Sequence, residues 1–266
     1  MTPHYSPYGK STAGEVAKDI AAFIAIFFEN FTQFEGRALH MASESYGGRY
    51  IPVFAVEIYD QNAMLTAAGI TPINLQSIMI GNGQTDFYTM LAACAEHLVR
   101  ESRYFYVLID VNIYIRSTQN NFRAHIYALS GKNPYDIGKD CDGPIEETMC
   151  YPVTKYISSF LNRPFVREKL GVYPSITGNF SFCSDAVRRA FVSIIDEYHA
   201  TDTHVAALLE RGVRALIFVG PYDWFCNWIG VQAWTPKMDW GGKEAFGQQS
   251  LRSWLESLER PGMRIK

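Results

Sequence analysis

The chain has 266 residues, of which 48% are hydrophobic and 19% charged, and its formal net charge is −3. This is the composition of a globular protein with enough apolar material for a sizeable core, and the length fits one large domain or two small ones. The charge balance provides no basic surface for nucleic acid, and the longest apolar stretch, 20–28, is too short to span a bilayer.

Residues 11–31 predict a helix that begins soon after the polar N-terminal stretch MTPHYSPYGKST, which does not resemble a signal peptide. Thr12 and Glu15 fit a capping box, in which their side chains satisfy free N–H groups of the first turn. An apolar face is expected from residues at helical spacing, namely Val16, Ile20, Phe23, Phe27 and Phe31.

Three short apolar runs predict buried strands over 37–42, 75–81 and 213–220. A helix is expected after the first run, and Pro52 should kink or interrupt it because proline lacks the backbone N–H. Another helix is expected before the third run, where Gly212 suits its C-terminal cap. This alternation of strands and helices favours a parallel sheet with helices on both faces.

The middle of the chain has a different pattern. From about Phe87 to about Ile194 the sequence is irregular and rich in aromatic clusters. We interpret this stretch as an inserted cap domain whose strands do not join the main sheet. The predicted division is therefore a first part of the core over 1–86, a cap over 87–195 and a second part of the core over 196–266.

The stretch Ser43-Glu44-Ser45-Tyr46-Gly47 lies between a predicted strand and a predicted helix. In a Gly-x-Ser-x-Gly turn of this kind, the sharp bend lifts a nucleophilic hydroxyl above the sheet, and the next backbone N–H can donate to an oxyanion. Ser43, which is also small, occupies the position of the first glycine. The alternative is a loop serine with no catalytic role.

Longer motifs occur in a fixed order along the chain, namely SESYGGRYIPVFAVEI, INLQSIMIGNGQTD, KNPYDIGKDC with CYP, and VGPYDWFCNWIGVQAW. Together they resemble the serine carboxypeptidases. The resemblance runs from about Ser11 to about Trp254 and is weakest between Tyr88 and His125. It implies an α/β-hydrolase core with an inserted cap, and hydrolysis of C-terminal residues from peptides through an acyl-enzyme formed by a Ser–Asp–His triad. It implies no cofactor and no metal.

The same resemblance assigns roles to single residues. Ser45 matches the nucleophile, Asp223 the triad acid and Tyr46 the donor of an oxyanion-hole N–H. Glu44 matches a glutamate that holds the substrate's terminal carboxylate when it is protonated, which favours activity in acid. For Asp223 the alternative is a turn aspartate that caps the next helix.

Three further residues match positions near the substrate pocket. Cys226 matches a free thiol, while Tyr135 and Tyr151 fall where cap residues line the pocket for the leaving residue. Burial in the core is an alternative for Cys226, and aromatic packing is an alternative for both tyrosines.

The chain has five cysteines, with no spacing typical of zinc. In an oxidising compartment an odd number leaves at least one thiol unpaired or paired outside the chain. The resemblance implies a Cys141–Cys150 disulfide and a partner for Cys183 upstream of residue 1, whereas Cys94 has no counterpart.

The expected order of the triad along the chain is Ser, Asp, His, yet no histidine follows Asp223. His40 is expected to point into the core or along the sheet, and His204 to lie on the surface. We assign the base to none of the six histidines, which are His4, His40, His97, His125, His199 and His204.

An upstream Asn-Gly-Gly-Pro-Gly loop, which supplies the second oxyanion donor in the family, has no counterpart in residues 1–44. The final strand and its Gly-His turn are also missing. We therefore expect a chain that is truncated at both ends, with an incomplete core and little hydrolytic activity. It is either a fragment or mispredicted product of a complete carboxypeptidase, or a shortened homologue without activity.

Other functions stay open. An acyltransferase of the same family and a non-catalytic module that binds peptide C-termini or a protein are the alternatives, whereas a generic lipase or esterase suits the cap motifs less well. The expected partners are peptide or protein C-termini, not nucleic acid or membrane. Sequons at Asn30 and Asn179 are compatible with the secretory pathway and a vacuolar, lysosomal or extracellular location.

Overall fold

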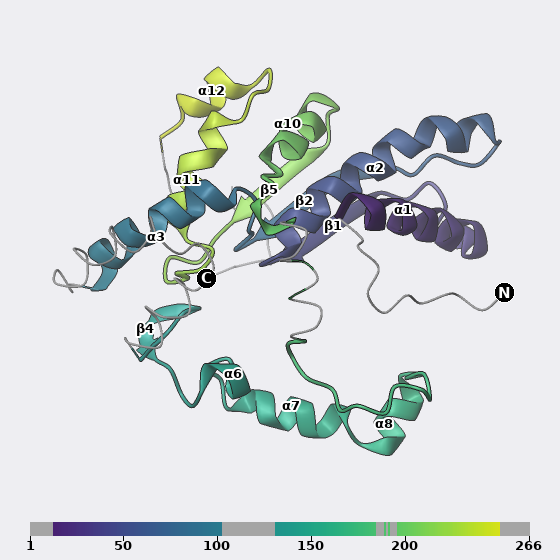
Figure 1. Ribbon diagram of the computed structural model, residues 1–266. Helices are drawn as coiled ribbons and strands as arrows, with labels where there is room; N and C mark the ends of the chain where they lie inside the picture. Colours follow the sequence, from purple (N-terminus) through teal and green to yellow (C-terminus); the bar gives the residue numbers. More distant parts are fainter. Residues whose placement is uncertain (1–12, 103–130, 185–188, 190, 192–195, 251–266) are drawn as a thin grey trace, which may run out of the picture.

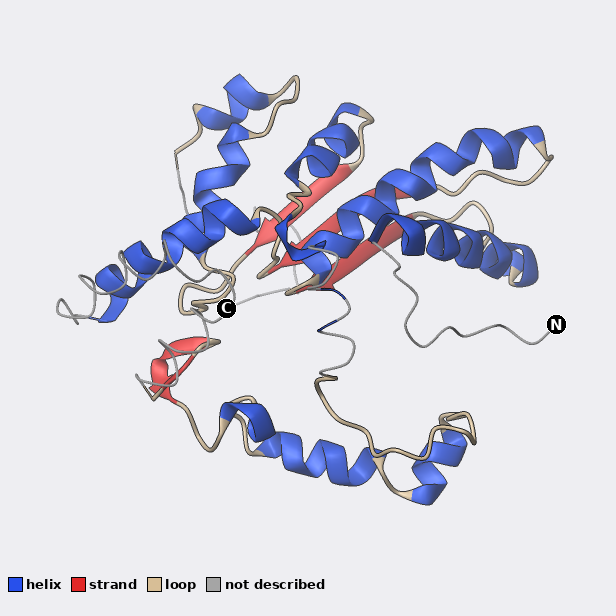
Figure 2. Cartoon of the chain, in the orientation of Figure 1, coloured by secondary structure: helices blue, strands red, loops and turns tan. Residues whose placement is uncertain are grey.

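The computed structural model of the chain describes residues 13–102, 131–184, 189, 191 and 196–250 (Figure 1). Its centre is a parallel sheet in the order β1-β2-β5, formed by β1 (Leu39–Glu44), β2 (Leu75–Gly81) and β5 (Arg214–Phe218). Figure 2 shows the three strands side by side among the helices. The last residues of β1 and β2 are paired in register, and Gly81 is paired with Phe218, so the strand ends meet at one edge. The three predicted strands and their parallel arrangement are confirmed.

One face of the sheet carries the core. Met41, Ile78 and Ile80 are buried there against α2 (Gly47–Ala67) and α10 (Asp202–Glu210). At the end of α10, Gly212 adopts φ +79°, and the N–H groups of Gly212 and Val213 donate to Leu209 and Leu208 at 3.0 Å each. This is the Schellman pattern, so the predicted glycine cap is confirmed.

Helix α1 (Ala13–Asn30) packs along α2. The predicted helix is confirmed, although Thr12 of the expected capping box lies outside the described residues. The predicted apolar face is not the buried one, however, because Ala13, Ala17 and Ala21 are buried while Phe23 is 63% exposed. Alanines let the two helix backbones approach closely, which a stripe of large side chains does not allow. A short 3-10 turn, η1 (Thr32–Phe34), follows α1.

Pro52 neither interrupts α2 nor ends it, since the helix runs from Gly47 to Ala67. Proline removes the N–H that would have bonded the carbonyl of Gly48. That carbonyl instead accepts from two hydroxyls, Thr201 Oγ1 at 3.1 Å and Thr85 Oγ1 at 3.3 Å. The expectation of an interruption was wrong because tertiary partners satisfy the group that proline leaves free.

The opposite face of the sheet is open in the described part of the chain, although helices were expected on both. Leu216 and Phe218 are 42% and 53% exposed on β5. His40 of β1 is also exposed, with its Nδ1 2.7 Å from Ser77 Oγ on the neighbouring strand. His40 therefore lies along the sheet, which is the second of the two expected placements, and does not enter the core.

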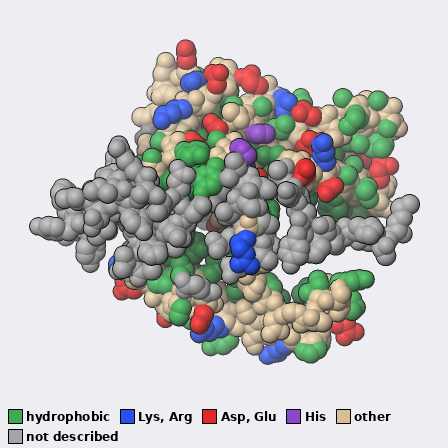
Figure 3. Space-filling model, in the orientation of Figure 1, with side chains coloured by type: hydrophobic (Ala, Val, Ile, Leu, Met, Phe, Trp, Pro, Cys, Tyr) green, Lys and Arg blue, Asp and Glu red, His purple; other side chains and the backbone are tan. Residues whose placement is uncertain are grey.

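The region predicted as a cap begins with α3 (Phe87–Ser102) and continues, after residues 103–130, with a hairpin of β3 (Lys132–Asn133) and β4 (Asp136–Asp140). As expected, these two strands form a sheet of their own. The helices α6 (Ile145–Thr148), α7 (Val153–Leu161) and α8 (Pro164–Lys169) follow, at the bottom of Figure 1. Several large apolar side chains there are exposed, including Tyr156 at 77%, and Figure 3 shows apolar side chains on this part of the surface.

The chain returns to the core through a short 3-10 turn, η3 (Asp196–Tyr198). After β5 it forms α11 (Trp228–Trp234), which packs on α3, and then η4 (Thr235–Lys237) and α12 (Lys243–Gly247). None of the helices in the described ranges is both long and apolar enough to cross a membrane.

Candidate functional site

Ser45 lies at the bend between β1 and α2 and has φ +59°, in the left-handed region that non-glycine residues rarely adopt. The bend is held by its backbone, because the Ser45 N–H donates to Gly81 at 3.2 Å and its carbonyl accepts from Gly48 at 3.0 Å and Gln84 at 2.9 Å. A strained, well-held residue between a strand and a helix is the geometry that raises a nucleophile above a sheet.

The bend depends on glycine at two positions. A Cβ on Gly47 would lie 2.5 Å from the Cβ of Ser43, and one on Gly48 would lie 2.7 Å from the backbone of Gly83 and Gln84. The small residues before and after Ser45 therefore allow strand and helix to approach, as the motif predicts. Within the described part of the chain, no backbone acceptor is paired with the Tyr46 N–H.

Asp223 lies in the loop between β5 and α11 and is buried. Its Oδ1 accepts from the Cys226 N–H at 3.0 Å, and its Oδ2 accepts from Asn82 Nδ2 at 2.8 Å. Asn82 directly follows β2, and its Oδ1 accepts from the Gly220 N–H at 3.2 Å. This residue was missed by the sequence analysis, although an asparagine between two glycines at a strand end was a visible signal.

Helix α3 holds the loop that carries Asp223. Trp224 Nε1 donates to the Cys94 carbonyl at 3.2 Å, and His97 Nε2 lies 2.8 Å from the Pro221 carbonyl oxygen. Asn227 caps α11 by accepting from Gly230 at 2.8 Å, and its amide donates to the Met90 carbonyl at 3.1 Å. The aspartate is thus fixed on both sides of the loop. The alternative for Asp223 was a turn aspartate that caps the next helix. Asp223 does not have this role, because the cap of α11 is Asn227.

Two carboxyl groups near the bend repel each other. Burial raises the pKa of Asp223, and the hydrogen bonds from Cys226 and Asn82 only partly oppose it. The pKa of Glu44, the last residue of β1, is raised by partial burial and by the charge of Asp223. Both effects favour the protonated form of Glu44 in mild acid.

Tyr135 in the β3–β4 hairpin lies close to the same groups. Burial raises its pKa to about 12, with further contributions from Cys183, Asp223, Glu44 and Cys226. Its ring packs edge-on against Phe225 with centroids 5.5 Å apart, and the ring of Tyr151 lies 6.4 Å away. The hairpin therefore brings Tyr135 to the carboxyl groups, while Tyr151 is more exposed.

The cysteines divide as follows. Cys141 and Cys150 form a disulfide, as expected. Cys226 is buried next to Asp223, Cys94 is buried in α3, and Cys183 is an exposed thiol.

Both sequon asparagines, Asn30 and Asn179, are exposed. In the described ranges no three His, Cys, Asp or Glu side chains are grouped as a metal site would need.

No described histidine is hydrogen-bonded to Ser45 or Asp223. His97 is buried with its Nε2 at the Pro221 carbonyl, and His199 is exposed. His204 is half-buried rather than on the surface, and burial lowers its pKa. His4 and His125 lie outside the described residues.

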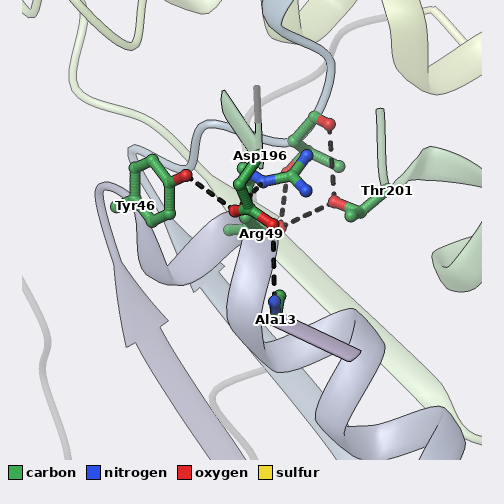
Figure 4. Close-up of polar contacts among 7 residues, drawn as sticks. Ala13, Tyr46, Arg49, Asp196 and Thr201 are labelled. Atoms are coloured by element: carbon green, nitrogen blue, oxygen red, sulfur yellow. Dashed lines mark hydrogen bonds and ion pairs between the residues drawn. The ribbon is translucent and has the colours of Figure 1, made fainter. Parts of the chain in front are cut away.

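Tyr46 and Arg49, which follow Ser45 in the chain, both reach Asp196 (Figure 4). The Tyr46 hydroxyl donates to Asp196 Oδ2 at 2.8 Å, and Arg49 Nε lies 3.2 Å from the same oxygen. Asp196 was also missed by the sequence analysis, because nothing in the sequence pairs it with residues about 150 positions away.

A serine carboxypeptidase family model matches residues 5–260 of the chain. The chain belongs to the serine carboxypeptidase family. It is 30% identical over 289 residues to carboxypeptidase Y of Komagataella phaffii, covering 97% of this chain and 52% of the relative. It is 34% identical to carboxypeptidase Y of Schizosaccharomyces pombe, covering 94% of this chain and 28% of the relative.

The fold has a solved counterpart in Kex1Δp, a prohormone-processing carboxypeptidase from Saccharomyces cerevisiae, with a TM-score of 0.68. Identity to it is 23%, and the match covers 87% of this chain and 54% of that structure. The expected α/β-hydrolase fold of a serine carboxypeptidase is thereby confirmed. The chain spans about half the length of these relatives or less.

Proposed function

We propose that Ser45 and Asp223 are the nucleophile and the acid of a serine-type carboxypeptidase site, which hydrolyses C-terminal residues of peptides and proteins. The observation that carries the proposal is the strained Ser45 bend at the same sheet edge as the buried Asp223 carboxylate, with Asn82 between their loops. In this role Ser45 Oγ attacks the scissile carbonyl, and the Tyr46 N–H stabilises the oxyanion. Asp223 orients a histidine and stabilises its cation.

Glu44 is proposed to bind the terminal carboxylate of the substrate. A carboxylate can receive a hydrogen bond from a carboxyl group only when that group is protonated, and the raised pKa of Glu44 extends this form to higher pH. Tyr135, Tyr151 and Cys226 are proposed to line the pocket for the leaving residue. The proximity of Tyr135 to Glu44 and Asp223 supports this assignment.

We further propose that the 266-residue chain alone hydrolyses peptides very slowly. No histidine follows Asp223 in these 266 residues, and no described histidine is hydrogen-bonded to Ser45 or Asp223. Loss of a triad member lowers kcat by about 10⁴–10⁶-fold.

Chemical rescue tests both parts of the proposal. The purified chain is assayed on an N-blocked dipeptide with and without imidazole, which can take the role of the triad histidine. We expect the rate of release of the C-terminal amino acid to rise with imidazole concentration, and we expect this release to be lost in S45A. Equal stimulation in the chain and in S45A would overturn the assignment of Ser45, and rapid Ser45-dependent hydrolysis without imidazole would overturn the proposed inactivity.

A peptide-binding homologue is the second candidate, since no described histidine is paired with Ser45 or Asp223. It predicts acid-dependent binding of peptide C-termini that S45A leaves unchanged and E44A weakens. An amidated peptide, which lacks the terminal carboxylate, is the matched control.

The secretory pathway is the proposed location, vacuolar, lysosomal or extracellular. The Cys141–Cys150 disulfide supports it, because disulfides persist in oxidising compartments. The two exposed sequons support it as well. Glycosidase-sensitive mobility of the protein from its native cells tests this location, and an unglycosylated, fully reduced protein would contradict it.

A further inference from the structure

Asp196 is a buried carboxylate that joins three segments of the fold (Figure 4). Its Oδ2 accepts from the Tyr46 hydroxyl at 2.8 Å and from Arg49 Nε at 3.2 Å. Its Oδ1 accepts from the Ala13 N–H at 3.4 Å, in the first turn of α1. A negative charge at that position also suits the positive end of the helix dipole.

Two of these three donors, Tyr46 and Arg49, follow Ser45 within the next four residues. Tyr46 supplies the candidate oxyanion N–H from its backbone, and its side chain ends on Asp196. Arg49 lies in the first turn of α2 and is 3% exposed. One carboxylate therefore holds the start of α2 at two points.

A second connection joins the same two segments. The Gly48 carbonyl, which Pro52 leaves without its helical partner, accepts from Thr201 Oγ1, and the Thr201 N–H donates to Thr85 at 2.9 Å. Residues 196–201 are thus hydrogen-bonded to the start of α2 at two points, through Asp196 and through Thr201. A strained residue such as Ser45 persists only where its surroundings over-determine its conformation.

We propose that Asp196 is a positioning residue, which holds Ser45 in its left-handed conformation and aims the Tyr46 N–H through its bonds to Tyr46 and Arg49. The proposal rests on the assignment of Ser45 as the nucleophile. It adds that residue 196, at the predicted boundary between cap and core, sets the geometry of the nucleophile bend. Asp196 touches no substrate in this role and acts only through its neighbours.

The test measures the environment of the side chain at position 45 and does not depend on hydrolysis. An S45C variant places a thiol at the bend, and its alkylation by iodoacetamide needs only the thiolate, which displaces iodide as the C–S bond forms. The rate is measured against pH at peptide resolution by mass spectrometry, because Cys94, Cys183 and Cys226 also carry thiols that are not in a disulfide. The midpoint of the profile reports how well the Tyr46 N–H and the start of α2 stabilise the thiolate.

Expected is an upward shift of that midpoint by about 0.2–0.7 pH unit in S45C/D196N and in S45C/Y46F, the range that a helix N-terminus contributes to a nearby anion. S45C/Y50F is the matched control, because the Tyr50 ring packs on Tyr46 at 5.0 Å while its hydroxyl is not a donor to Asp196 in the described contacts. Its midpoint should stay at the S45C value.

Unchanged midpoints in both S45C/D196N and S45C/Y46F, with only the melting temperature lowered, would overturn the proposal and leave Asp196 a merely structural residue. If D196N does not fold, Y46F carries the test, since it removes a single hydroxyl. Failure of the proposed function is distinguishable, because a shifted midpoint with no Ser45-dependent hydrolysis in the presence of imidazole would refute the carboxypeptidase assignment alone.

Discussion

Asn82 donates a hydrogen bond of 2.8 Å to the carboxylate of Asp223, although the two are 141 positions apart in the chain. The same asparagine accepts from the Gly220 N–H and has φ +42°, in the left-handed region. It thus joins the end of β2 to the loop after β5. The candidate acid is held by a residue that lies between it and the nucleophile bend.

Replacing Asn82 should separate the contribution of its side chain from that of its backbone. N82G keeps the left-handed conformation but loses both side-chain bonds, so we expect the free energy of unfolding to fall by about 1–3 kcal/mol. N82A should lose about 1 kcal/mol more, because alanine is strained at positive φ. Urea unfolding measures both, and an N82G variant as stable as the parent would contradict the prediction.

The close approach of strand and helix at the bend makes a second prediction. A Cβ on Gly47 would lie 2.5 Å from Ser43 Cβ, so G47A should destabilise the chain by about 1–3 kcal/mol through overpacking. The double variant S43G/G47A removes the opposing Cβ and should recover much of the loss. G178A is the control, because nothing lies within 4 Å of a Cβ at Gly178.

Asn227 makes a third prediction, which concerns the loop of Asp223. It is fully buried, caps α11 through Gly230 and donates to the Met90 carbonyl. N227A should cost about 1–3 kcal/mol, from a lost cap and an unsatisfied buried carbonyl. N227D keeps the cap acceptor but not the donor, so thermal unfolding should place it below the parent. A parent-like N227D would show that the Met90 bond contributes nothing.

The elements closest to the site were predictable from local pattern. Short apolar runs ending at glycine or at a small-residue motif gave β1, β2 and β5, and Gly212 indicated the end of α10. Ser45 was a candidate because it follows such a strand within a small-residue motif, whereas Asp223 was assigned only through the resemblance of the longer motif around it. These signals are contained within a few residues, so they need no tertiary information.

Tertiary contacts decided the rest. Pro52 was expected to kink or interrupt α2, and only Thr85 and Thr201, distant in sequence, supply partners for the carbonyl that it leaves free. His40 could not be placed, because alternation along a strand does not say which sheet face is covered. The roles of Asn82 and Asp196 depend on partners more than 100 residues away.

The buried pair of Asp196 and Arg49 predicts a loss of stability in acid. Burial opposes ionisation of Asp196, but the Tyr46 hydrogen bond and the Arg49 charge outweigh it and hold its pKa below the usual range. A depressed folded-state pKa contributes stability above the unfolded pKa that is lost as pH falls through the folded value. The stability difference between the parent and D196N should therefore be constant at neutral pH and shrink below about pH 4. A difference that does not vary with pH would contradict the ionised pair.

Glu44 predicts the opposite dependence on pH. Because partial burial and the Asp223 charge raise its folded-state pKa, the folded chain binds the Glu44 proton more tightly than the unfolded chain does. Its favourable contribution is complete below the unfolded pKa and is lost as pH rises through the folded value. E44Q should therefore gain stability relative to the parent between about pH 4 and pH 7, as measured by urea unfolding across that range. The same series in a D223N background should show a smaller gain, because the repelling charge is gone, whereas an unchanged gain would show that burial alone raises the pKa of Glu44.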